Sequence, residues 1–91
     1  MIFEWDDNKN RTNKLKHGLD FEVAATVFDD PLSCSRIDNE GRWQTVGHAE
    51  GGILLLFVAH TYHEEDEIII RIISVREVTP RERMHYEAGS F

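Results

Sequence analysis

The pattern of apolar and polar positions is clearest near the C-terminal end of the chain. The stretch Ile68-Ile69-Ile70-Arg71-Ile72-Ile73-Ser74-Val75-Arg76 predicts a strand that is apolar on both faces. In a regular strand, alternate side chains share a face. One face would then carry Ile68, Ile70, Ile72, Ser74 and Arg76, and the other Ile69, Arg71, Ile73 and Val75.

Arg76 ends this strand, and its guanidinium is charged at any ordinary pH. A permanent cation on a rigid element suits a phosphate-binding or phosphate-cleaving site. The alternative is an arginine that leaves the sheet and meets solvent, as most arginines do.

Further strands precede this one. Residues Ser33 to Asp38 are predicted to pair with Trp43 to His48 across a turn at 39–42, and Ile53 to Tyr62 forms a long strand. Short connections between these strands predict an antiparallel meander. Ile2 to Trp5 predicts a short first strand.

Capping residues mark three helices. Asp6 or Asp7 begins a helix that runs to about His17 and ends at Gly18, and Asp20 begins a second helix, Phe21 to Phe28. The segment Thr79-Pro80-Arg81-Glu82 is a capping box that begins a third helix, ending near Gly89. The fold class is therefore α+β, a single domain (1–91) with two N-terminal helices and a C-terminal helix on one face of a mostly antiparallel sheet.

Composition fits one small globular domain, with 91 residues, 41% hydrophobic and 30% charged. No apolar run approaches the roughly 20 residues of a membrane span, and the N-terminus does not resemble a signal peptide. A single cysteine, Cys34, excludes an internal disulfide and a cysteine metal cluster. We expect a cytoplasmic protein that does not contact membranes.

The net charge of −7 argues against a protein that coats nucleic acid non-specifically. The basic residues nevertheless gather in two segments. These are Lys9, Arg11, Lys14, Lys16 and His17, and then Arg71, Arg76, Arg81 and Arg83. The chain is thus predicted to carry a local basic patch on an acidic body, unless these residues are only a solvated helix face.

Several motifs together resemble a known family. They are Phe3-Glu4-Trp5-Asp6, Lys9, Asn13, Lys16-His17-Gly18, Phe21-Glu22, Ala24, Val27-Phe28-Asp29-Asp30-Pro31, Ile72-Ile73-Ser74-Val75-Arg76, Glu82-Arg83 and Tyr86-Glu87. In this order and spacing, from Ile2 to about Glu87, the chain resembles the BrnT toxins of type II toxin–antitoxin pairs.

The resemblance implies a RelE-like ribonuclease fold, RNA cleavage without a metal or other cofactor, and arrest of translation. It also implies a small partner, a BrnA-like antitoxin that neutralises the toxin and binds the operon DNA, so that the toxin meets DNA only indirectly. The chain departs from the family pattern at Val75, where alanine is common, and at Glu77, where a basic residue is usual. The acid beside Arg76 weakens the attraction of this site for RNA.

Metal-free RNA cleavage needs a base, an acid and an electrostatic clamp. The predicted catalytic residues are Arg76, His17, Lys16, Arg83 and Tyr86, and the predicted RNA-binding residues are Lys9, Asn13, Arg71 and Arg81. Arg76 would clamp the phosphate, and His17 would carry a proton because an imidazole titrates near neutral pH. Each residue also has a structural alternative, such as an Arg83–Glu87 pair or a Tyr86 ring packed on the sheet.

Two other interpretations remain open. His60, His63 and Glu64 suggest a metal site, but the two histidines point to opposite faces of a strand. The alternative function is a catalytically weak or inactive acidic binding module that holds a basic, DNA-binding antitoxin.

Overall fold

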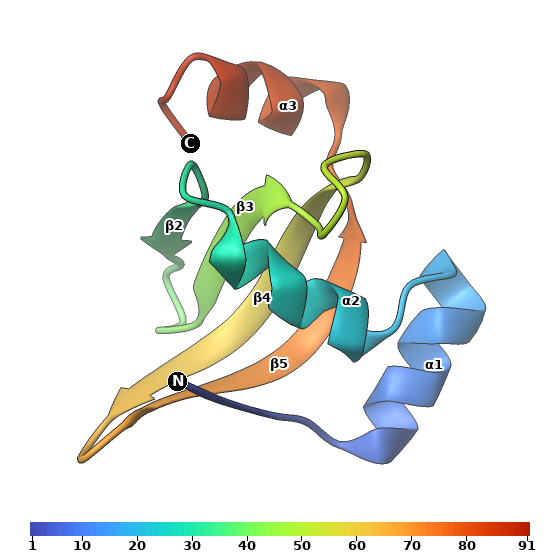
Figure 1. Cartoon of the computed structure of the whole chain (residues 1–91), viewed down its shortest axis with the longest axis vertical. Helices are drawn as coiled ribbons and strands as arrows, with labels where there is room; N and C mark the ends of the chain where they lie inside the picture. Colours follow the sequence, from blue (N-terminus) through green and yellow to red (C-terminus); the bar gives the residue numbers. More distant parts are fainter.

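The structure, a computed structural model, describes all 91 residues. Figure 1 shows a sheet with α2 in front of it, α1 beside it at the right and α3 at its upper end. The elements are β1 (Ile2–Glu4), α1 (Asp7–His17), α2 (Phe21–Thr26), a 3₁₀ turn η1 (Val27–Asp29), β2 (Cys34–Ile37), β3 (Trp43–His48), β4 (Leu55–Glu64), β5 (Ile68–Glu77) and α3 (Pro80–Glu87). None of the helices has the length and apolar character needed to cross a bilayer.

The five strands form one sheet in the order β1-β5-β4-β3-β2. All neighbours are antiparallel except β1, which runs parallel to β5. The predicted α+β class, the order of elements and the meander from β2 to β5 are therefore confirmed.

The local signals at the helix ends are also confirmed. Asp6 caps α1 by accepting a hydrogen bond from the Lys9 N–H, and Gly18 ends that helix with a φ of 71°, which favours glycine. Thr79 and Glu82 form both bonds of the capping box at the start of α3. The second helix is shorter than predicted, because the chain tightens into η1 after Thr26.

A β-bulge in β5 overturns the predicted assignment of its side chains to faces. Ala59 pairs with Ser74, but the next residue of β4, His60, pairs with Ile72, so Ile73 is an extra residue without a partner. The alternation of side chains between the two faces of the sheet therefore shifts by one residue at Ile73. Ser74 and Arg76 lie on the face opposite Ile72, and Val75 lies on the same face as Ile72.

The main core lies on the face of the sheet covered by α2 and η1, here called the helix face (Figure 1). Leu56 and Val58 of β4 and Ile70, Ile72 and Val75 of β5 are buried there. They pack against Phe21, Ala24 and Val27, which are all fully buried. Burying this apolar surface is the main stabilising contribution to such a small domain.

The opposite face, here called the open face, is covered only at one end. Tyr86 of α3 packs there on Val46, Leu55 and Phe57, and the Phe91 ring meets Phe57. The prediction that all three helices lie on one face is therefore wrong. A strand that is apolar on both sides needs cover on both sides, and α3 supplies it at this end of β4.

Candidate nucleic-acid interface

The three arginines that lie on strands all belong to the open face. Arg76 pairs with Phe57, and Arg71 pairs with Thr61 in the same sheet. Arg36 belongs to the row that continues through Gln44, Ala59 and Ser74. Because directly paired residues share a face, three permanent cations project from one side of the sheet.

Arg76 is held rigidly on this face. Its guanidinium donates two hydrogen bonds to the Glu82 carboxylate, of 2.8 and 2.9 Å, and lies 4.2 Å from the centre of the Phe57 ring. Hydrogen bonding with Glu82 raises the pKa of Arg76, and the same bonds lower the pKa of Glu82. The cation is thus well positioned, but its charge is already balanced by Glu82.

Helix α1 covers the edge of β5 beyond the end of β1, where a bare strand would expose unpaired backbone groups. Asn13 makes this contact from a buried position. Its amide donates to the carbonyls of Val75 and Leu19, each at 2.9 Å, and its carbonyl accepts from the Val75 N–H at 3.0 Å. One side chain therefore replaces a neighbouring strand at Val75.

The basic residues of α1 border the same edge. Lys9, Lys16 and His17 stand four before, three after and four after Asn13, so they share its side of the helix. With Ile73 and Ser74 of the bulge they line a shallow hollow of about 320 Å³. Since Ser74 belongs to the open face, this hollow borders the face that carries Arg76.

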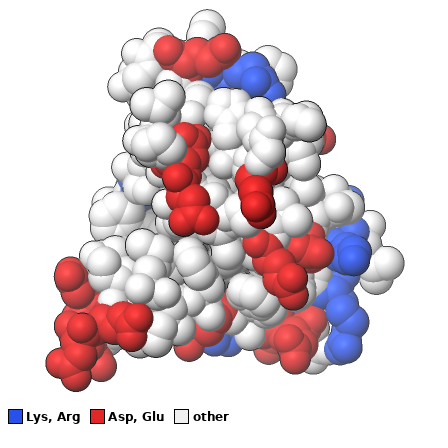
Figure 2. Space-filling model, viewed as in Figure 1, with Lys and Arg blue, Asp and Glu red and all other residues white.

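The helix face differs from the open face in its charge. Figure 2 shows carboxylates gathered over the helix face and the tip of the β4–β5 hairpin, with lysines and arginines at the edge formed by α1. The net charge of −7 is thus unevenly distributed, and the strand arginines face away from these acids. A polyanion would be repelled by the acidic helix face.

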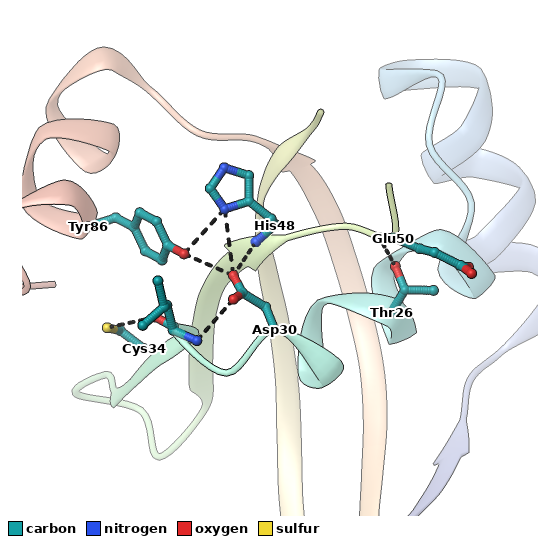
Figure 3. Close-up of polar contacts among 7 residues, drawn as sticks. Thr26, Asp30, Cys34, His48, Glu50 and Tyr86 are labelled. Atoms are coloured by element: carbon teal, nitrogen blue, oxygen red, sulfur yellow. Dashed lines mark hydrogen bonds and ion pairs between the residues drawn. The ribbon is translucent and has the colours of Figure 1, made fainter. Parts of the chain in front are cut away.

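A second polar cluster lies where α3 meets the sheet. Figure 3 shows Tyr86 and His48 pointing toward Asp30, which follows η1. The Tyr86 hydroxyl donates a hydrogen bond to Oδ2 of Asp30 at 2.9 Å, and the backbone N–H of His48 donates to the same oxygen at 2.7 Å. The ring nitrogen Nδ1 of His48 lies 3.2 Å from the Tyr86 hydroxyl oxygen. This cluster anchors α3 to β3.

The titration of this cluster follows from its contacts. Burial acts to raise the pKa of Asp30, but hydrogen bonds from the backbone of His48 and Leu32 and from Tyr86 outweigh it, so the pKa is lowered. Burial and the Asp30 contact raise the pKa of Tyr86 to about 12. Tyr86 therefore keeps its proton at neutral pH.

The comparison with protein families is decisive for identity. A family model described as "Ribonuclease toxin, BrnT, of type II toxin-antitoxin system" matches residues 5–82. The chain belongs to the BrnT family. The predicted resemblance is thereby confirmed.

A solved structure supports the same fold. The crystal structure of the Brucella abortus ribonuclease toxin BrnT superposes with a TM-score of 0.68 at 23% identity, and the match covers 87% of this chain and 99% of that one. A search of curated proteins finds no match.

The structure brings some predicted site residues of this BrnT chain together and separates others. Lys9, Lys16 and His17 border the edge of β5, on the open face of which Arg71 and Arg76 lie. The remaining predicted residues have other surroundings. Asn13 is buried against Val75, Tyr86 is buried against Asp30, and Arg81 and Arg83 are exposed on α3.

Sequence reasoning missed Glu82 as the partner of Arg76, and it missed Arg36 and Gln44 as members of the open face. The capping box was a usable signal for Glu82, because it fixes that carboxylate near the end of β5. The face on which Arg36 lies depends on the register of β2 against β3, and the sequence predicted only the turn between these strands, not their register. Nowhere do three His, Cys, Asp or Glu side chains come close enough to hold a metal ion.

Proposed function

We propose that this BrnT chain is a metal-independent endoribonuclease of the cytoplasm, which inhibits translation and is neutralised by a BrnA-like antitoxin. In this proposal RNA lies across the open face, along the edge of β5 between α1 and α3. The observation that carries it is the placement of Arg36, Arg71 and Arg76 on one face, with the basic side of α1 at its border.

Each chemical role has a candidate group. Arg76 would stabilise the charge on the phosphorane, exchanging part of its contact with Glu82 for phosphate oxygens. His17, exposed at the end of α1, would transfer a proton, and Lys16 and Lys9 would bind neighbouring phosphates. Arg71 would bind the phosphate backbone of the RNA farther along the sheet.

The test compares two exposed arginines that each contact a carboxylate. Arg71 lies on the open face beside Glu4, whereas Arg42 lies on the β2–β3 turn beside Asp38 and Glu40. We expect Arg71→Glu to reduce RNA binding and cleavage at least tenfold, and Arg42→Glu to change them less than twofold. Cleavage by the wild type should persist in EDTA and leave 2′,3′-cyclic phosphate ends.

Equal effects of the two substitutions would contradict the assignment of the open face. Loss of cleavage in EDTA, restored by added metal, would contradict the metal-free chemistry.

A second candidate function is a catalytically inactive module that holds a DNA-binding antitoxin. It is favoured by the Glu82 carboxylate, which already neutralises Arg76. Under this alternative the purified chain would leave RNA intact while still forming a tight complex with its antitoxin.

A further inference from the structure

The most enclosed hollow outside the proposed RNA site lies on the helix face, beside η1. It has a volume of about 320 Å³ and is lined mainly by the apolar and aromatic side chains Met1, Phe28, Trp43, Tyr62 and Ile70. The rings of Trp43 and Tyr62 lie 5.8 Å apart and form an aromatic wall. Such a surface accepts a planar or aliphatic group.

The polar atoms at this hollow have a fixed hydrogen-bond direction. His60 Nδ1 lies 2.9 Å from the Thr61 carbonyl, which can only accept, so Nδ1 carries the proton. Burial lowers the pKa of His60, so the ring is neutral and Nε2 accepts from the Thr45 hydroxyl at 2.7 Å. The Ser35 hydroxyl must then donate to Thr45, also at 2.7 Å.

Ser35 therefore offers only lone pairs to the hollow, so the occupant should bring an N–H or O–H donor. The rim adds a net negative charge, because the Met1 ammonium offsets only one of the two carboxylates there, Glu64 and Glu67. The Tyr62 hydroxyl donates to Glu64 at 3.1 Å, and the Met1 amine contacts Glu67 at 3.2 Å, which places the hairpin acids at the hollow. Figure 2 shows these acids gathered at the hairpin tip.

These features exclude a phosphate and favour a cation with a flat, donor-rich head. A guanidinium stacks on Trp and Tyr rings, donates to lone pairs and pairs with carboxylates. Resting on the proposed function, which supplies an antitoxin partner, we propose that the hollow at Trp43 and Tyr62 binds an arginine side chain of that antitoxin. The partner would thus have an anchoring contact on the acidic helix face.

The test measures the affinity of the chain for its cognate antitoxin, the small protein encoded in the same operon, by calorimetry on the full-length proteins. Tyr62→Ser removes half of the aromatic wall from an exposed position, and Glu64→Lys reverses a charge at the rim. Glu22→Lys is the matched control, because Glu22 is also exposed on the helix face but does not line this hollow.

We expect Tyr62→Ser and Glu64→Lys each to weaken antitoxin binding at least tenfold, and Glu22→Lys less than threefold. Replacing the antitoxin's arginines one at a time by alanine should identify one whose loss has no further effect in the Tyr62→Ser background. Cleavage of RNA by the free variants should equal that of the wild type.

Unchanged antitoxin affinity in Tyr62→Ser, or equal losses in Glu64→Lys and Glu22→Lys, would overturn the proposal. So would weaker RNA binding with normal antitoxin binding, which would make the hollow a base-binding site. A wild-type chain that fails to cleave RNA contradicts the proposed enzymatic function alone, because the antitoxin measurement does not depend on cleavage.

Discussion

Replacing Asn13 by alanine tests how α1 is held against the sheet. The substitution removes three hydrogen bonds and leaves the N–H and carbonyl of Val75 and the carbonyl of Leu19 without that partner. Each buried group left unpaired costs about 1–3 kcal/mol. Because water can enter at a sheet edge, we take the low end and expect Asn13→Ala to lower the free energy of unfolding by about 3 kcal/mol.

That loss is a large fraction of the roughly 5–15 kcal/mol available to a small domain. With a urea m-value of about 1.5 kcal/mol/M, the midpoint of unfolding should fall by about 2 M. Asn8→Ala is the control for stability, because Asn8 is an exposed residue of the same helix whose side chain contacts only the exposed Arg11; it should shift the free energy of unfolding by less than about 0.5 kcal/mol.

The measurement also separates a structural role from the predicted RNA contact. A midpoint within about 0.3 M of the wild type, combined with weaker RNA binding, would refute the hydrogen-bond reasoning and favour direct contact of Asn13 with RNA. A large loss of stability, with RNA affinity kept by the folded fraction at low temperature, would support it.

Three further predictions concern α3 and the turn beneath it. Tyr86→Phe should cost about 2 kcal/mol, because it removes a hydrogen bond to the largely buried Asp30 carboxylate. Folding raises the pKa of Tyr86 from 10.0 to about 12, so the protonated hydroxyl stabilises the folded state fully below pH 10, and this contribution is lost as the pH rises toward 12. The free energy of unfolding of Tyr86→Phe, measured against pH, should not show this decrease between pH 10 and pH 12. Gly47→Ala should lower the thermal midpoint, with a cost of about 1–3 kcal/mol, because the added methyl would lie 2.9 Å from Cβ of Ser33, which directly precedes β2. Glu82→Gln should cost about 1 kcal/mol of stability, because it weakens the cap of α3. The same substitution should raise RNA affinity in a filter-binding assay, because it frees the charge of Arg76. Unchanged affinity would show that the Arg76–Glu82 pair does not compete with phosphate.

Much of the fold follows from local signals. Asp6, Gly18 and the Thr79 capping box act within a few residues of themselves, so their sequence patterns predict the helix ends that are observed. The apolar runs that became β4 and β5 are similarly local, since burial on two faces requires apolar residues at successive positions.

The candidate site is less predictable because it depends on pairing between distant segments. The bulge at Ile73 arises from the register of β4 against β5, and it moved Arg76 to the opposite face from the one predicted. The role of Asn13 likewise depends on Val75, 62 positions away. No local pattern distinguishes an asparagine that holds a sheet edge from one that contacts a ligand.

The extra residue at Ile73 sets the phase of everything that follows it in β5. If the present sequence formed a regular strand without the bulge, the guanidinium of Arg76 would point into the core layer and Val75 would point outward. Deleting Ile73, in contrast, would leave a regular ladder in which Ser74, Val75 and Arg76 keep their partners and their faces. One unpaired residue in the ladder is therefore what allows two apolar positions in a row, Ile72 and Ile73, to precede a cation displayed on the outer side of the sheet.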